Sequence, residues 1–162
     1  MWPFNRTPKK PPADPYSDYL TPEQFLRGSR CAQLTSDERA IVERRLSAFD
    51  GQMVHPQYAA DMFGVFAAAG LATYGLDIVR GAEKPESAED RAELLGAALS
   101  ALQNADMIYP HPALKAHVAE LLDAIGRSTD ANRIRSEASR EEAARTKKET
   151  DQILLTDLTC RL

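Results

Sequence analysis

The sequence predicts an all-α protein, and three observations support that fold class. Alanine, leucine, glutamate and arginine dominate the 162 residues, whereas β-branched and aromatic residues are sparse, which favours helices over strands. Helix-start signals recur along the chain, and apolar residues follow them at helical spacing. We therefore expect about six helices, with two tandem helical hairpins that form a bundle or a short helical array. An extended N-terminal arm and a long charged C-terminal helix complete the expected architecture.

The length and charge of the chain limit the classes of protein to consider. A chain of 162 residues is expected to form one domain with appendages, large enough to bury a core without disulfides or metal. The formal net charge is -4, and residues 21–127 carry ten bases against fifteen acids. Because binding to a polynucleotide backbone needs a positive surface, no nucleic-acid partner is expected.

The first 20 residues are predicted to be a flexible, proline-rich arm. Five prolines remove amide donors and fix φ, which disfavours packed structure in residues 1–20. Trp2 and Phe4 prefer burial, yet they stand on this arm beside basic residues. Both are candidate interaction residues, either in a docking peptide or in a weak membrane-surface contact. The alternative is that the tip folds back on its own domain or has no fixed structure.

Residues 21–127 are predicted to form the helical domain, because each expected helix has a recognisable start. Thr21 and Thr35 each begin a capping box, with Gln or Glu at the third helical position. Ser87 begins a similar segment, and two further helices start at prolines, which suit the first helical turn. The predicted starts divide this part of the chain into short helices joined by loops.

The most apolar stretch of the chain, residues 55–79, predicts a central helix. It is about long enough to cross a bilayer, but its alanines, its glycines and Asp77 make it a weak span. A helix buried on all sides in a soluble protein is the preferred interpretation. Asp77 is expected to pair with Arg80 one turn later, and a buried acid in a ligand pocket is the alternative. Tyr74 lies in the same turns, and both it and Asp77 are weak site candidates.

Two segments of the chain are similar to each other, which suggests an internal duplication. Residues 36–70 and 88–126 share matching residues in both helices, a His-Pro helix start and a terminal glycine. Each copy is interpreted as a helical hairpin that cannot bury its apolar face alone and packs against the other copy. Because the second copy ends at Gly126, a kink or break is expected near the equivalent Gly70. Chance similarity between alanine- and leucine-rich helices is the alternative.

The last segment, residues 128–162, is predicted to be a charged helix that projects from the body or lies loosely on it. Acid–base pairs at helical spacing support an exposed helix. The helix becomes apolar at its end, where it has side chains to bury. The candidate interaction residues of this tip are Ile153, Leu154, Leu158 and Leu162.

Patterns of reaction chemistry are not evident in the sequence. Motifs for catalysis, cofactor binding or metal binding are absent, and Cys31 and Cys160 do not form a cluster with zinc spacing. Two free thiols are typical of a reducing compartment and indicate a cytoplasmic protein. His55 and His111 are weak site candidates, because equivalent histidines of two hairpins could converge on a ligand. The simpler interpretation is that each histidine marks a helix boundary.

These observations favour a non-enzymatic helical interaction or assembly subunit, that is, an adaptor or scaffold. A protein partner or self-association is expected, through the apolar residues at both ends of the chain. One alternative is a small-molecule-binding protein or enzyme with a site between the two hairpins, near His55 and His111. Another is a peripheral membrane protein that is tethered through its N-terminal arm.

Overall fold

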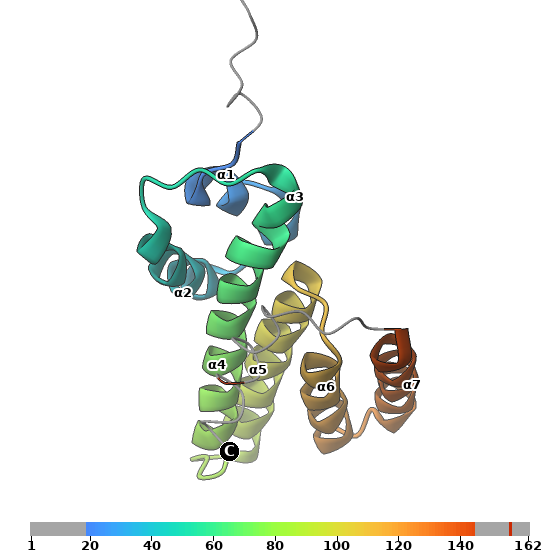
Figure 1. The fold of residues 1–162 in the computed structure, drawn as a ribbon. Coiled ribbons are helices and arrows are strands. Elements are labelled where there is room, and N and C mark those ends of the chain that lie inside the picture. Colours follow the sequence, from blue (N-terminus) through green and yellow to red (C-terminus); the bar gives the residue numbers. More distant parts are fainter. Residues whose placement is uncertain (1–18, 145–155, 157–162) are drawn as a thin grey trace, which may run out of the picture.

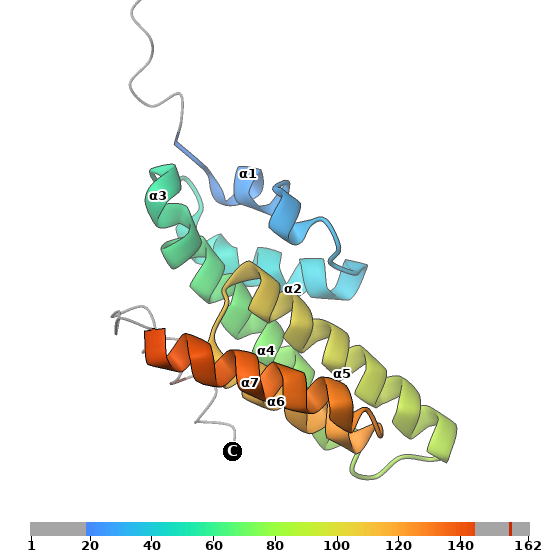
Figure 2. The ribbon, with the colours of Figure 1, turned by 90° about the vertical axis from the view of Figure 1, so that its right-hand side faces the viewer.

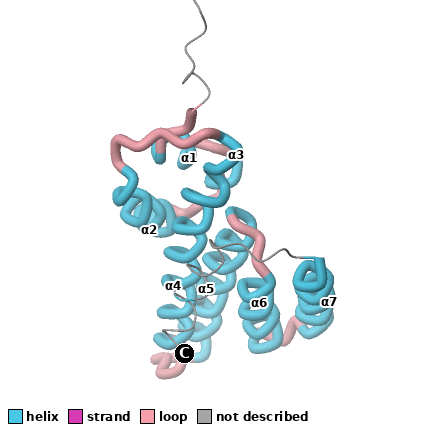
Figure 3. Tube along the Cα trace, in the orientation of Figure 1, coloured by secondary structure: helices cyan, strands magenta, loops and turns pink. Residues whose placement is uncertain are grey.

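The computed structural model describes residues 19–144 and Thr156. Within these residues the chain is helical, apart from loops and one isolated antiparallel bridge between Leu20 and Val54 (Figure 1, Figure 3). The predicted all-α fold class is therefore confirmed. Nearly all of the predicted proline-rich arm, residues 1–20, lies outside the described residues.

The N-terminal layer consists of short helices at one end of the described chain (Figure 1). Its elements are α1 (Pro22–Leu26), η1 (Ser29–Cys31), α2 (Ser36–Leu46) and η2 (Ser47–Phe49). Thr21 and Thr35 begin α1 and α2 with complete capping boxes, as the sequence predicts. The guanidinium of Arg39 donates hydrogen bonds to the main-chain oxygens of Leu26, at 3.2 Å, and Cys31, at 3.1 Å. These bonds satisfy carbonyls at the ends of α1 and η1 and hold both helices against α2.

The longest helical rod runs from Pro56 to Gly81 and bends near its start. It comprises α3 (Pro56–Ala59), the π-helical turn η3 (Ala60–Gly64) and α4 (Val65–Gly81). A π-helical turn contains an extra residue, which redirects the chain between α3 and α4 (Figure 1). The kink predicted near Gly70 is wrong, because α4 continues through Gly70 without a break. A β-carbon at Gly70 would stand 2.6 Å from Cγ of Arg45, so this glycine allows α2 to pack closely against α4.

The C-terminal half of the described chain forms a row of antiparallel helices. The elements that follow α4 are α5 (Ala88–Ile108), α6 (Pro112–Ala124) and α7 (Ser128–Ala144). Figure 1 shows α4, α5, α6 and α7 side by side in chain order, and Figure 2 shows α7 in front of α6. The most extensive packing joins α4 to α5 and α6 to α7, followed by α2 to α4 and α5 to α6. We call these four helices the α4–α7 row.

The first half of the predicted C-terminal helix lies along α6. Ala131 is fully buried, and Ile134 packs against the core. The chain turns between α6 and α7 at Gly126, whose φ of 82° favours glycine. Most of the remaining segment lies outside the described residues, so its projection from the body and the boundary at residue 127 stay predictions.

Among the described residues, the core combines apolar side chains from the helices with a buried carboxylate. The largest fully buried side chains include Phe63, Leu46, Leu71, Leu102, Ile108, Leu114 and Leu122. The carboxylate belongs to Glu38, which is 2% exposed. It accepts hydrogen bonds from the amide of Thr35 at 2.9 Å, the hydroxyl of Ser100 at 3.3 Å and the side-chain amide of Asn104 at 2.9 Å. These bonds satisfy the buried oxygens of the Glu38 side chain and link α2 to α5.

The rod from Pro56 to Gly81 is long and apolar enough, by length and composition, to cross a membrane. However, 56% of its apolar window is buried inside the protein. Core helices of soluble proteins share this property.

Within the two similar segments, α2 packs against α4 and α5 packs against α6. The duplication of the two segments stays a prediction.

Candidate functional site

The predicted interaction residues at the two ends of the chain are not part of the described structure. They are Trp2, Phe4, Ile153, Leu154, Leu158 and Leu162. Their role in binding a partner or a membrane surface therefore stays a prediction. The four weak site candidates, in contrast, lie within the described residues and are placed below.

His55 lies on the surface near the point where the described chain begins. Its ring meets the ring of Tyr19 edge-to-face, with centroids 5.6 Å apart, and the ring of Tyr58 at 6.2 Å. Its Nδ1 accepts a hydrogen bond from the amide of Gln57 at 3.4 Å. Met53 and Tyr58 are 53% and 55% exposed, so the group forms an apolar surface patch. Aromatic residues and methionine are enriched in protein interfaces, which makes this patch a secondary candidate for protein contact.

His111 is a buried helix cap. It is 5% exposed, and its Nδ1 accepts a hydrogen bond from the amide of Ala113 at 3.1 Å. Its own main-chain amide donates to Oδ1 of Asp106 at 3.1 Å. The imidazole is therefore engaged in starting α6. Neither His55 nor His111 lines the groove and the hollow described below, and a ligand site between the two hairpins stays a prediction.

Tyr74 and Asp77 both lie on α4. The side chain of Tyr74 is half-buried. Asp77 pairs with Arg80 at 3.8 Å, and about half of each side chain is exposed. The expected Asp77–Arg80 pair is therefore present, and the carboxylate does not lie in a buried ligand pocket. An exposed pair of this kind contributes little to stability.

An apolar groove lies between α4 and α6, with α5 as its floor. Its volume is about 270 Å³. Leu76 and Val79 form the α4 wall, Leu95 and Leu102 form the floor, and Leu121 belongs to the α6 wall. Leu76 and Val79 are half-buried, so part of this apolar surface is open to solvent. We call this feature the α4–α6 groove.

Charged and polar side chains of both signs border the α4–α6 groove. Glu83 follows α4, Arg91 lies on α5, and His117 and Glu120 lie on α6. Nδ1 of His117 and Oε2 of Glu120 are 3.3 Å apart. Pockets for drug-sized ligands typically enclose about 300–1,000 Å³. The α4–α6 groove is smaller and half-enclosed, with an apolar floor and a charged rim, which suits an amphipathic helix better than a small molecule.

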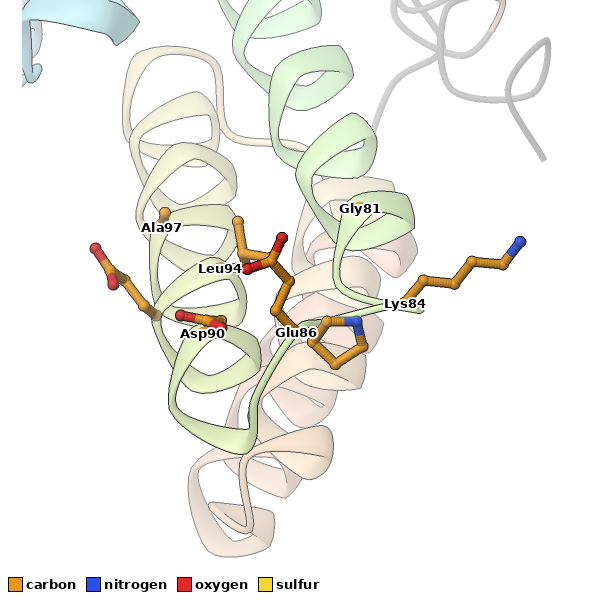
Figure 4. Close-up of a pocket in the computed structure, with 8 residues that line it drawn as sticks. Gly81, Lys84, Glu86, Asp90, Leu94 and Ala97 are labelled. Carbon is orange, nitrogen blue, oxygen red and sulfur yellow. The ribbon is translucent and has the colours of Figure 1, made fainter.

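A hollow of about 440 Å³ beside the loop between α4 and α5 is more open to solvent. Its lining includes three acids, Glu86, Asp90 and Glu93, while the Lys84 side chain extends away from Asp90 (Figure 4). Asp90 accepts a hydrogen bond from the hydroxyl of Ser87 at 2.7 Å as part of the α5 cap. Acids spread around an open surface stay hydrated, so this hollow lacks the convergent geometry of a binding site.

A buried lysine joins three helices of the row. Lys115 on α6 is 7% exposed, and its ammonium pairs with Asp106 of α5 and, at 3.3 Å, with Glu141 of α7. Burial lowers the pKa of Lys115, but the hydrogen bond and charge of Asp106, together with Glu141, raise it above the usual value of 10.5. The lysine is therefore charged at neutral pH and acts as a link between helices rather than as a nucleophile or base.

Two further features of the described residues concern thiol chemistry and metal binding. Burial raises the pKa of the Cys31 thiol against the lowering effect of Arg39 and Arg30, so the thiol is protonated at neutral pH and unreactive. Between residues 19 and 144, and at Thr156, no group of three or more His, Cys, Asp or Glu residues is arranged to hold a metal ion. Comparison with protein-family models, curated proteins and solved structures gives no match to this chain.

The sequence does not reveal the α4–α6 groove. The spacing of Leu76 and Val79, and of Leu121 and Ala124, shows in the sequence that each helix has an apolar face. That spacing does not show which helices stand side by side, because the same faces would also fill the core of a closed bundle. The groove depends on the open arrangement of α4 and α6 on either side of α5.

Proposed function

We propose that this protein is a non-enzymatic helical interaction subunit, an adaptor or scaffold, that binds an amphipathic helix of a partner protein in the α4–α6 groove. The observation that supports this proposal is the groove itself, with an apolar floor on α5, half-buried walls at Leu76 and Val79, and a rim of both charge signs. A helix with apolar residues at positions i, i+3, i+4 and i+7 presents the complementary surface. Its charged flanks would meet the rim.

The enzymatic alternative has less support from the described residues. The most buried amine, that of Lys115, is held by carboxylates, and the thiol of Cys31 is buried and protonated. We place the protein in the cytoplasm, because Cys31 is a free thiol and the sequence has two cysteines far apart.

Site-specific photo-crosslinking in the native cell tests this proposal. A benzophenone amino acid replaces Val79 in the groove or, as a control, the exposed Arg44 on α2. We expect covalent adducts with another polypeptide at position 79 and not at position 44. The crosslinked peptide of the partner should carry apolar residues at helical spacing. Equal adduct yields at the two positions would contradict the proposal.

A pair of substitutions adds a second control. With the benzophenone at position 76, V79E places a charge in the apolar wall and is expected to abolish the adducts. E93A changes a side chain two residues beyond Arg91, on the opposite face of α5, and is expected to leave them unchanged. Circular dichroism checks that both variants keep their helices. Retention of the adducts in V79E would show that the crosslinked partner lies elsewhere.

A further inference from the structure

We infer that residues 150–162 of this same chain occupy the α4–α6 groove as an amphipathic helix, which a partner helix must displace. The inference rests on the proposed function, because it concerns the regulation of the same groove.

The pattern of the segment fits the groove. On a helix with about 100° per residue, Leu154, Leu155, Leu158 and Leu162 fall within an arc of about 100°. Ile153 falls outside this arc. Four leucines on one face form the narrow apolar stripe that an amphipathic helix places into a groove. The half-buried Leu76 and Val79 of the α4 wall offer apolar surface to meet it, above the buried leucines of the floor.

Thr156 supports this placement of the stripe. It is in helical conformation and exposed. On the same helical wheel, Thr156 lies about 150° from the centre of the leucine stripe. A helix whose leucines face the groove therefore presents Thr156 to solvent, as observed.

The chain is long enough to reach the groove. The described helix α7 ends at Ala144, and Glu141 near that end is paired with Lys115 in the first turn of α6. Residues 145–153 span about 30 Å when extended, at about 3.3 Å per residue. Helix α6 is about 20 Å long and about 10 Å wide. The linker can therefore cross α6 and deliver the stripe to the far side of that helix, where the groove lies.

The segment of the same molecule is favoured over that of a second copy as the occupant of the groove, because its effective concentration is higher. A segment joined to its site through a short linker is present there at a concentration on the order of millimolar. A second copy reaches such a concentration only in a very concentrated solution. The groove is therefore expected to be occupied within a single molecule.

Paramagnetic relaxation enhancement in the full-length protein tests this inference. A nitroxide is attached to Cys160, because Cys31 is fully buried and its thiol is protonated. We expect the label to weaken the NMR signals of Leu76, Val79 and Leu121, and not those of α2. The isotope-labelled protein is measured at low concentration. In a second sample, chains that carry the nitroxide but no isotope label are mixed with isotope-labelled chains that carry no nitroxide. Weakened signals in this mixture report contact between copies.

Two matched variants of the full chain complete the test. L158S combined with L162S removes half of the stripe, and V79E places a charge in the groove wall; each is expected to restore the groove signals. E93A, on the opposite face of α5, is expected to leave the weakening unchanged. Undiminished groove signals in the labelled wild type, or weakening that occurs only between copies, would overturn the inference.

The failure of this inference and that of the proposed function are distinguishable. If the label weakens the groove signals but no partner is crosslinked at position 79, the segment occupies the groove and the partner-binding function is wrong. If a partner is crosslinked and the label has no effect, the groove binds a partner and the inference is wrong. If both hold, L158S with L162S is expected to raise the yield of partner adducts, because the competing segment is removed.

Discussion

The two similar segments, 36–70 and 88–126, start a helix with the same His-Pro pair, yet the two histidines have opposite surroundings. His55 is exposed, and the short α3 and a π-helical turn follow it. His111 is buried, and the straight helix α6 follows it. Four residues after each histidine, the first segment has the buried, uncharged Ala59, whereas the second has Lys115 with its ion pairs.

The helix-start residues of the two segments differ in the same way. Thr35 and Ser87 both cap a helix, and Glu38 and Asp90 occupy the third position of each helix. Glu38 is buried and bonded to α5, whereas Asp90 stays on the surface. Similar sequence therefore places the ends of the helices in both segments, while the neighbouring helices decide which cap residue is buried and what it contributes to stability.

The largest expected effect concerns Glu38. E38A removes the cap partner and leaves the amide of buried Asn104 without its acceptor, so we expect the free energy of unfolding to fall by about 3 kcal/mol. D90A, at the equivalent surface position, is expected to cost about 1 kcal/mol or less. Urea unfolding of the two variants measures the difference. Equal losses of unfolding free energy would contradict the conclusion that the buried Glu38 contributes more to stability than the exposed Asp90.

Lys115 gives the next effect, and it depends on pH. K115M leaves Asp106 without its buried partner, so we expect a loss of about 2 kcal/mol at neutral pH. The pKa of Lys115 is raised in the folded state, so its contribution is fully present below the unfolded pKa and is lost as pH rises through the folded pKa. Wild-type stability should therefore fall above about pH 10.4.

The control for this effect is the alkaline behaviour of K115M itself. Tyrosines and other lysines titrate in the same range in both proteins, so the difference between the two stability curves isolates Lys115. Urea unfolding between neutral and strongly alkaline pH supplies the curves. Parallel curves for wild type and K115M would show that the ion pair does not depend on the charge of the lysine.

The two terminal glycines give a smaller effect. Gly126 has φ of 82°, and the amide of Arg127 bonds to the carbonyl of Leu122 across it, so G126A is expected to cost about 1–2 kcal/mol. G70A gains helix propensity of about 1 kcal/mol, but its β-carbon would lie 2.6 Å from Cγ of Arg45 and 3.3 Å from Cγ2 of Ile41, so we expect a net loss of about 1 kcal/mol. Thermal unfolding of G126A and G70A measures the two changes in stability. A larger loss in G70A would show that Arg45 cannot move.

The smallest effect concerns the histidines themselves. H111A removes the acceptor for the amide of Ala113 at a buried cap and is expected to cost about 0.5–1 kcal/mol. H55A removes a longer bond at an exposed cap, and its effect is expected to lie within about 0.5 kcal/mol. Denaturant midpoints measure both. If H55A were the more costly variant, the aromatic contacts of His55 with Tyr19 and Tyr58 would be the cause to examine.

The sequence predicted those parts of the fold that depend on local chemistry. The caps at Thr21, Thr35 and Ser87, and the proline starts at Pro56 and Pro112, all lie where helices begin. These features depend on residues three or four positions apart, so the sequence contains the necessary information.

The sequence did not predict the features that depend on distant neighbours. A kink or break was expected near Gly70, because the second of the two similar segments ends at the equivalent Gly126. The position of Gly70 under Arg45 of α2 instead makes the absence of a side chain favourable within an unbroken helix. The π-helical turn at Ala60–Gly64 and the α4–α6 groove were missed for the same reason. Both require knowledge of which helices lie side by side.

The row of helices from α4 to α7 also has a consequence for the way the molecule opens. Each helix of the row packs against the next one in the chain, so its contacts join segments that are close in sequence, and little loop-closure entropy opposes folding. Helix α7 stands at the end of the row and can detach while the interface between α4 and α5 stays closed. Protection of the main-chain amides from hydrogen exchange should therefore be highest at the α4–α5 interface and fall towards α7.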